Sequence, residues 1–145
     1  MTAVYNLGVI YANNGDSAKA KSLYKEASDN DDTSASIALG NLYHREENFE
    51  ESLKYYKKVL HNSTAQYKYA QQYHLGQGVE KNLDVAYFWY KQSALEENVD
   101  AQYEVAWMLY EGKGIDKNRD EAKVWMTKLA DQGYDYAIKD LEKWA

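Results

Sequence analysis

The sequence predicts an all-α fold in which antiparallel helix pairs stack as a solenoid. Three observations predict this fold class. The 145-residue chain contains no proline, the strongest helix breaker. Apolar and small residues recur with helical spacing. Whole blocks of sequence return after a fixed interval, which is the signature of a repeat architecture.

The clearest interval is 36 residues, between the third and fourth repeats. The segment Ala65-Gln66-Tyr67 returns as Ala101-Gln102-Tyr103. The same offset joins Gly76, Gly78, Lys81, Asn82, Ala86, Trp89 and Ala94 to Gly112, Gly114, Lys117, Asn118, Ala122, Trp125 and Ala130. So many matches at one offset indicate two copies of one structural unit.

Two shorter repeats precede this pair. Leu7, Gly8, Tyr11 and Tyr24 return 32 residues later as Leu39, Gly40, Tyr43 and Tyr56. Ala137 and Leu141 continue the 36-residue step beyond the fourth repeat. We therefore predict one domain over 1–145, with repeats at about 2–32, 33–63, 64–99 and 100–134 and a capping helix at 135–145.

Within each repeat, small residues hold one position of the first helix. Gly8, Gly40, Ala70 and Ala106 occupy this register. A glycine inside a helix costs roughly 1 kcal/mol relative to alanine. Its presence therefore predicts that the partner helix approaches closely at this position.

Capping signals divide the repeats into helices. Asn48 with Glu51, Asn118 with Glu121, and Ser63 with Gln66 have capping-box spacing. Gly15 and Gly133 mark turns that need a left-handed residue. The predicted helices are 2–13, 16–29, 33–45, 48–62, 64–75, 82–97, 100–111, 118–132 and 135–144.

The third and fourth repeats resemble Sel1-like repeats, a subclass of the tetratricopeptide-like superhelical proteins. The family pattern appears in Ala65, Tyr67, Tyr69, Ala70, Gly76, Gly78, Val79, Ala86, Trp89, Tyr90 and Ala94, and again 36 residues later. The first two repeats lack the Gly-x-Gly turn and resemble plain tetratricopeptide repeats. The resemblance implies a right-handed superhelix whose first helices line a concave face, and it implies protein–protein contacts.

Composition narrows the function classes. The chain has no cysteine, which excludes a disulfide framework, a thiol nucleophile and thiolate metal ligands. A net charge of −6 argues against a nucleic-acid or anionic-membrane partner and is compatible with a basic protein. No apolar run is long enough for a membrane span. With no secretion signal evident, we expect a cytoplasmic protein.

No motif predicts catalysis, a cofactor or a metal site. Gly76-x-Gly78 and Gly112-x-Gly114 follow helices and lack the third glycine of a dinucleotide loop, which favours structural turns. His44 and His74 share a register and could lie near each other, but no third ligand is evident. Asp29-Asn30-Asp31-Asp32 lacks the later glycine and glutamate of a calcium loop. We expect a non-enzymatic protein with no cofactor and no metal.

If the family geometry holds, the inward registers of the first helices form the partner-binding surface. The predicted binding residues are Tyr5, Ile37, Asn41, His44, Arg45, Tyr67, Gln71, His74, Tyr103, Trp107, Tyr110 and Glu111. Tyr67 and Tyr103 either face the groove or pack on the neighbouring helix. We expect Trp107 to be exposed and central to binding, because Asn41 and Gln71 hold the equivalent positions. Leu7 and Tyr11 should point into the core.

These residues favour a module that binds a protein or peptide partner in its concave groove. An alternative is an inhibitor or immunity-type protein that sequesters a basic toxin or enzyme, since the chain is short and acidic. The first helix has no predicted covering element. The protein is therefore expected to be a monomer or a weak dimer that associates through this helix.

Overall fold

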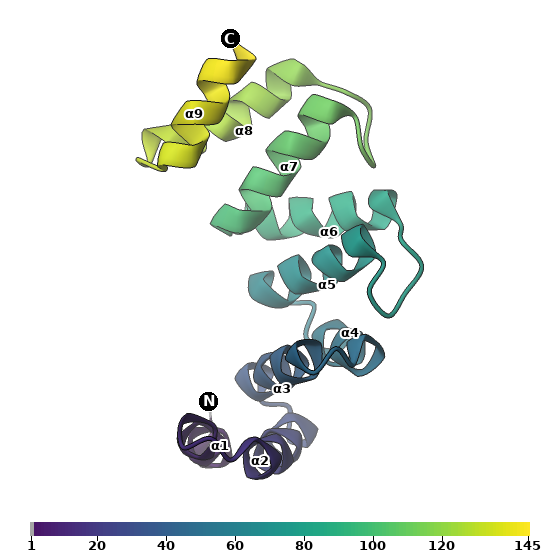
Figure 1. The fold of residues 1–145 in the computed structure, drawn as a ribbon, viewed down its shortest axis with the longest axis vertical. Helices are drawn as coiled ribbons and strands as arrows, with labels where there is room; N and C mark the ends of the chain where they lie inside the picture. Colours follow the sequence, from purple (N-terminus) through teal and green to yellow (C-terminus); the bar gives the residue numbers. More distant parts are fainter. Residues whose placement is uncertain (1) are drawn as a thin grey trace.

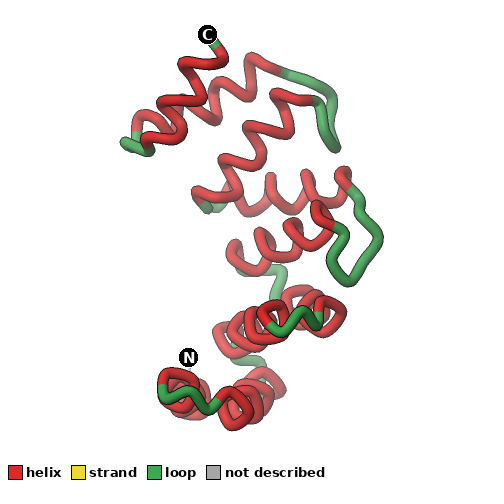
Figure 2. The backbone as a smooth tube through the Cα atoms, viewed as in Figure 1, coloured by secondary structure: helices red, strands yellow, loops and turns green. Residues whose placement is uncertain are grey.

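The structure, a computed structural model, describes residues 2–145. These residues form nine helices and no strand, so the all-α prediction is confirmed (Figure 2). The helices are α1 (Ala3–Asn13), α2 (Ser17–Asp29), α3 (Thr33–Arg45), α4 (Phe49–Lys58), α5 (Ser63–Leu75), α6 (Leu83–Leu95), α7 (Val99–Glu111), α8 (Arg119–Asp131) and α9 (Asp135–Trp144). None of them is long and apolar enough to cross a membrane.

The helices stack pair by pair in a bowed row, from α1 at one end to α9 at the other (Figure 1). The long α5–α6 and α7–α8 turns project on the outer side of the bow. At the N-terminal end, α1 and α3 lie on the inner side of α2 and α4. The chain is a solenoid of helix pairs with α9 as the last helix, which confirms the predicted fold class.

Asparagine and aspartate side chains begin most of the helices. Asp32, Asn98 and Asn118 each accept a hydrogen bond from the backbone N–H three residues later. Such caps satisfy N–H groups that have no partner inside the helix. One predicted cap is wrong, because Asn62 rather than Ser63 caps α5. Asn48 is the N-cap residue of α4, as predicted, but its side chain makes no capping hydrogen bond.

In the third and fourth pairs, a longer turn joins the two helices, and each of these turns contains two left-handed glycines. In the α7–α8 turn, Gly112 ends α7 at φ 72° and Gly114 follows at φ 74°. A Cβ atom on Gly114 would lie 2.2 Å from the carbonyl oxygen of Leu83, at the start of α6. The glycine pattern therefore lets each long turn dock against the preceding pair, and the prediction of structural turns is confirmed.

Small residues allow close packing within each pair, as predicted. A Cβ on Gly8 would lie 2.7 Å from the Tyr24 ring, and a Cβ on Gly40 would lie 2.6 Å from the Tyr56 ring. Both distances are shorter than a carbon–carbon contact. The tyrosine of each second helix thus fills the space that glycine leaves on the first.

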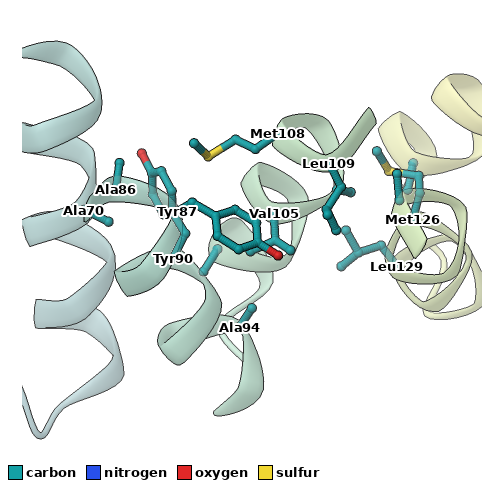
Figure 3. Close-up of a cluster of buried hydrophobic side chains, with 14 of the residues drawn as sticks. Ala70, Ala86, Tyr87, Tyr90, Ala94, Val105, Met108, Leu109, Met126 and Leu129 are labelled. Carbon is teal, nitrogen blue, oxygen red and sulfur yellow. The ribbon is translucent and has the colours of Figure 1, made fainter. Parts of the chain in front are cut away.

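The core divides into two clusters. The smaller one joins α1 to α4 around Tyr24, Leu39 and Tyr55. The larger one extends from α5 to α9, where residues such as Val105 and Met126 are fully buried (Figure 3). Because each pair contacts only its neighbours, burial accumulates along the row instead of at one centre.

Three sequence expectations need correction. The predicted helix 48–62 ends at Lys58, because the chain turns over Val59–Asn62 to enter α5. Leu7 is 43% exposed and lies outside the core, since no helix precedes α1 among the described residues. Tyr11 is only half-buried, packed against the smaller cluster.

Candidate partner-binding surface

Three adjoining hollows lie along the first helices of the N-terminal half, and Asn41 lines all of them. Their volumes are about 310, 230 and 160 Å³. Together they form the Asn41 groove, lined by Tyr5, Ala12, Ser17, Tyr24, Ser34, Ile37, Ala38, Asn41, Leu42, His44, Arg45, Tyr56, Asn62, Thr64 and Lys68. The groove spans the helices that lie on the inner side of the bow.

Five of the predicted binding residues meet in this groove. They are Tyr5, Ile37, Asn41, His44 and Arg45. The Tyr56 hydroxyl on α4 donates a 2.5 Å hydrogen bond to Asn41 Oδ1, which fixes the orientation of the Asn41 side chain. His44 Nε2 lies 3.1 Å from Gln77 Oε1 in the α5–α6 turn. The inward registers inferred for α1 and α3 therefore match the observed surface.

Sequence reasoning missed Lys68, which lines the same hollow as Asn41 and Arg45. Lys68 occupies the register one residue after Tyr67. The equivalent residue of α3, Ala38, also lines the groove. This register lies on the same helical face as the predicted binding residues. Extending the inward set by one residue would have identified Lys68.

The groove differs in charge from the rest of the chain. Its lining contains Arg45 and Lys68 but no aspartate or glutamate. Among the described residues, neither cation has a carboxylate oxygen within 4.0 Å. The groove is thus a local donor-rich surface on a molecule of net charge −6.

The middle of the inner face carries a separate cluster between α5, α6 and α7. The Tyr67 ring packs on Tyr90 with centroids 5.6 Å apart. His74 Nδ1 lies 3.1 Å from the Tyr90 hydroxyl and 4.0 Å from Glu104 Oε2. Gln71 on the same helix is half-buried. Tyr67 therefore packs on its neighbour helix, which is the second of the two roles considered for it.

Burial perturbs the ionisation of this cluster. Burial raises the pKa of Tyr67 to about 12 and also raises the pKa of Tyr90, and nearby carboxylates add to both effects. Burial, with the charge of Asp100, raises the pKa of Glu104. Burial also lowers the pKa of His74, helped by two lysines. Each group is shifted toward its neutral form, as expected for side chains removed from water.

At the C-terminal end, the capping helix α9 covers the predicted aromatic anchor. The Trp144 ring lies edge-on to Trp107 at 5.0 Å and stacks on Tyr110 at 4.1 Å. The Tyr103 hydroxyl donates a 2.7 Å hydrogen bond to Asp140. The expectation of an exposed Trp107 is therefore wrong, because the residue is half-buried in the packing of α7 against α9. Glu111 remains exposed, 3.8 Å from Lys113.

The two inner-face histidines have different neighbours, Gln77 for His44 and Tyr90 for His74. Within residues 2–145, no group of three or more His, Asp or Glu side chains could hold a metal ion.

A further hollow of about 400 Å³ lies between α2 and α4, and it was not anticipated from the sequence. Stacked rings of Tyr43 and Tyr55, 5.7 Å apart, line it together with positively charged lysines and negatively charged carboxylates. None of the predicted binding residues lines this hollow.

Family models match almost the whole chain. A Sel1 repeat model matches residues 63–98 and again 99–134. Tetratricopeptide repeat models match residues 2–34 and 35–68. The chain belongs to the Sel1-like, tetratricopeptide-like repeat proteins. The division into plain and Gly-x-Gly repeats is the same as in the prediction. A search of curated proteins returns no match.

Solved structures include close matches in fold for this Sel1-like repeat protein. A protective antigen of uropathogenic Escherichia coli superposes with a TM-score of 0.89 at 23% identity, over 96% of this chain and 32% of the antigen. A Sel1 repeat protein of Oxalobacter formigenes gives 0.86 at 24% identity, over 94% and 58%. Helicobacter pylori cysteine rich protein B gives 0.57 at 23% identity, over 61% and 68%.

The chain therefore spans about a third and about three fifths of the first two of these proteins. At such identities the likeness establishes the fold alone. Repeats of this fold generally mediate protein–protein interaction and are typically non-catalytic scaffolds.

Proposed function

We propose that this Sel1-like repeat protein is a non-enzymatic interaction module that holds a protein or peptide partner in the Asn41 groove. One observation carries the proposal. The hollows on the inner face adjoin one another along α1, α3 and α5, so a single partner can engage three helices at once.

The chemistry of the groove supports a protein partner. Tyr5 and Ile37 offer apolar surface, and Asn41 and Arg45 offer hydrogen-bond donors. Partly exposed aromatic and arginine side chains are the residues that dominate measured interfaces. The side chains come from rigid helices, so little conformational entropy is lost when a partner binds.

The inhibitor or immunity-type alternative is less well supported. Sequestering a basic toxin would use acidic contacts at the binding surface. The groove lining has none, and the acidic side chains of the inner face, Glu104 and Glu111, lie toward the other end of the row. We therefore prefer the general interaction module.

A groove-blocking substitution tests the proposal. Ile37→Asp places a charge in one hollow, while Val124→Asp places the same charge on α8, where Val124 is 68% exposed. We expect the wild-type chain and Val124→Asp to capture the same protein from native cells, identified by mass spectrometry. Ile37→Asp should reduce its recovery by about tenfold or more. Equal recovery with all three chains, each checked for folding by circular dichroism, would contradict the proposal.

Weak self-association through α1 remains a separate proposal. Leu7 and Ile10 are 43% and 55% exposed, whereas the equivalent Leu39 and Leu42 are buried under the preceding pair. A monomer in sedimentation equilibrium at millimolar concentration would remove this proposal.

A further inference from the structure

We propose that the hollow between α2 and α4 binds a small zwitterion with an apolar body, of the size and chemistry of a free aromatic amino acid. This hollow shares no lining residue with the Asn41 groove. The proposal is therefore independent of the proposed function, and either one can fail without the other.

The first support is the size of the hollow. Its volume of about 400 Å³ exceeds that of each hollow in the Asn41 groove, the largest of which measures about 310 Å³. Sites for small molecules have volumes of about 300 to 1,000 Å³. The side chains that line the hollow come from α2 and α4, with Tyr43 added by α3. The space thus suits one compact molecule.

The second support is an apolar surface made of two tyrosine rings. The rings of Tyr43 and Tyr55 both line the hollow, with centroids 5.7 Å apart and planes within 11° of parallel. Tyr55 is only 7% exposed, and Tyr43 packs against the same core cluster. Because the core holds both rings in place, they offer a rigid surface to an aromatic or apolar ligand.

The third support is the balance of charge around the hollow. Each helix contributes one lysine and one carboxylate, namely Lys25 and Asp29 on α2 and Lys54 and Glu51 on α4. Within residues 2–145, none of these four side chains lies within 4.0 Å of an opposite charge. Lysines without an ion pair are common on this chain. The distinctive feature here is that opposite charges line one hollow without pairing across it.

A fifth charged residue, Lys58, does not disturb this balance. It lines the same hollow, but its ammonium group donates hydrogen bonds to the carbonyl oxygen and the hydroxyl of Ser28. The Nζ atom of Lys54, in contrast, lies 5.7 Å from the centre of the Tyr55 ring. Two ammonium groups and two carboxylates therefore remain for a ligand.

The carboxylates of both helices act on the aromatic surface. Burial raises the pKa of Tyr55, and Tyr43, Glu51 and Asp29 raise it further. Negative charge from α2 and from α4 therefore converges on one ring. An ammonium group placed beside this ring would be attracted by both carboxylates and by the ring face.

These charges select a ligand that carries both signs. An anion would be attracted by the lysines but repelled by Asp29 and Glu51, and a cation would be attracted and repelled in the opposite way. A zwitterion can pair its carboxylate with the lysines and its ammonium group with the carboxylates. Its apolar body then covers the tyrosine rings. A free aromatic amino acid has this combination of groups.

Ligands that lack one group test the proposal on the full chain. Tryptophan carries both charges, tryptamine lacks the carboxylate, indolepropionate lacks the ammonium group, and glycine lacks the apolar body. Proton–nitrogen correlation NMR should show tryptophan shifting backbone amides of α2 and α4, with a dissociation constant of about 1 mM or lower. We expect the two singly charged indoles to bind about threefold or more weakly. Glycine should cause no shift.

A double variant tests the two carboxylates. Asp29→Asn with Glu51→Gln removes both negative charges from the hollow, so we expect it to abolish the preference for tryptophan over indolepropionate. The matched control is Glu26→Gln with Glu50→Gln. These two exposed carboxylates lie on the same helices but do not line the hollow, so the control should keep the preference.

A second double variant tests the two lysines. Lys25→Gln with Lys54→Gln should abolish the preference for tryptophan over tryptamine. Its control is Lys19→Gln with Lys57→Gln, two exposed lysines of α2 and α4 that do not line the hollow. The control should retain the preference of the wild-type chain.

Four results would overturn the proposal. They are the absence of shifts in α2 and α4 with tryptophan, equal or tighter binding of a singly charged indole by the wild-type chain, shifts with glycine equal to those with tryptophan, and equal losses in a hollow variant and its control. The peak dispersion of the same spectra verifies that each variant is folded. Ile37→Asp, which changes the Asn41 groove, should leave tryptophan binding unchanged, and a loss there would also contradict the assignment.

Discussion

Glu104 shows how a single residue can carry an unfavourable charge inside an otherwise stable repeat. It lies 4.0 Å from His74, but burial lowers the pKa of that histidine, which leaves the imidazole mainly neutral at pH 7. Burial and Asp100 raise the pKa of Glu104 above its ordinary 4.5. Just above pH 4.5 the folded state therefore holds more of this proton than the unfolded state. Stability from this group falls as pH rises through that window.

Replacing Glu104 by its neutral isostere should remove this cost. We expect Glu104→Gln to be more stable than the wild-type chain at pH 7, and the difference to shrink as pH falls toward 4.5. Urea unfolding at several pH values measures it. Glu142→Gln, on the exposed side of α9, is the matched control and should leave the pH dependence unchanged. A Glu104→Gln chain that is less stable at pH 7 would contradict the assignment.

Other single residues took their roles from neighbours distant in the sequence. Trp107 has the residue type of an interface anchor, but Trp144 packs on it and places it in the cap. No sequence pattern distinguishes Lys68 from the other lysines, but it lines the same open hollow as Arg45. The residue type and register were predictable in both cases. The solvent exposure of the two side chains was not predictable, because it depends on which helix packs against them.

At the scale of elements, the Gly-x-Gly turns distinguish the C-terminal repeats from the N-terminal ones. Their second glycine has both a left-handed backbone and no room for a side chain. The turn after α1 has the first property only, because a Cβ on Gly15 would meet nothing within 4 Å. The two positions therefore separate the backbone cost from the packing cost.

We expect Gly15→Ala to reduce the free energy of unfolding by about 1 kcal/mol, the cost of a left-handed alanine. Gly114→Ala should cost at least about 2 kcal/mol more, because its Cβ overlaps the Leu83 carbonyl. Urea denaturation followed by circular dichroism gives both values. Equal losses at the two positions would mean that the long turn does not dock on α6 as the structure has it.

For the whole molecule, the division of the core predicts uneven stability. The larger cluster joins five helices, whereas the smaller one joins four, and α1 exposes Leu7 and Ile10. In a solenoid, stability is approximately the sum of the repeats and the contacts between neighbours. The N-terminal repeats, which hold the Asn41 groove, should therefore open more readily than the C-terminal ones.

Hydrogen exchange measures this gradient directly. We expect backbone amides of α7, at the centre of the larger cluster, to exchange at least about tenfold more slowly than those of α1. Mass spectrometry after peptic digestion resolves the two helices. Uniform protection from α1 to α9 would instead indicate that the chain unfolds as one cooperative unit.

The sequence by itself determined the repeats, the helix pairs and their turns. These features follow from local patterns that recur at fixed intervals, such as the small residue at Gly8 and Gly40 and the left-handed glycine at Gly76 and Gly112. The tertiary structure decided which inward residues line an open groove. It moved the candidate site from Trp107 to Asn41, because the exposure of an inward residue depends on the neighbouring pair. Spacing along the chain cannot encode that contact.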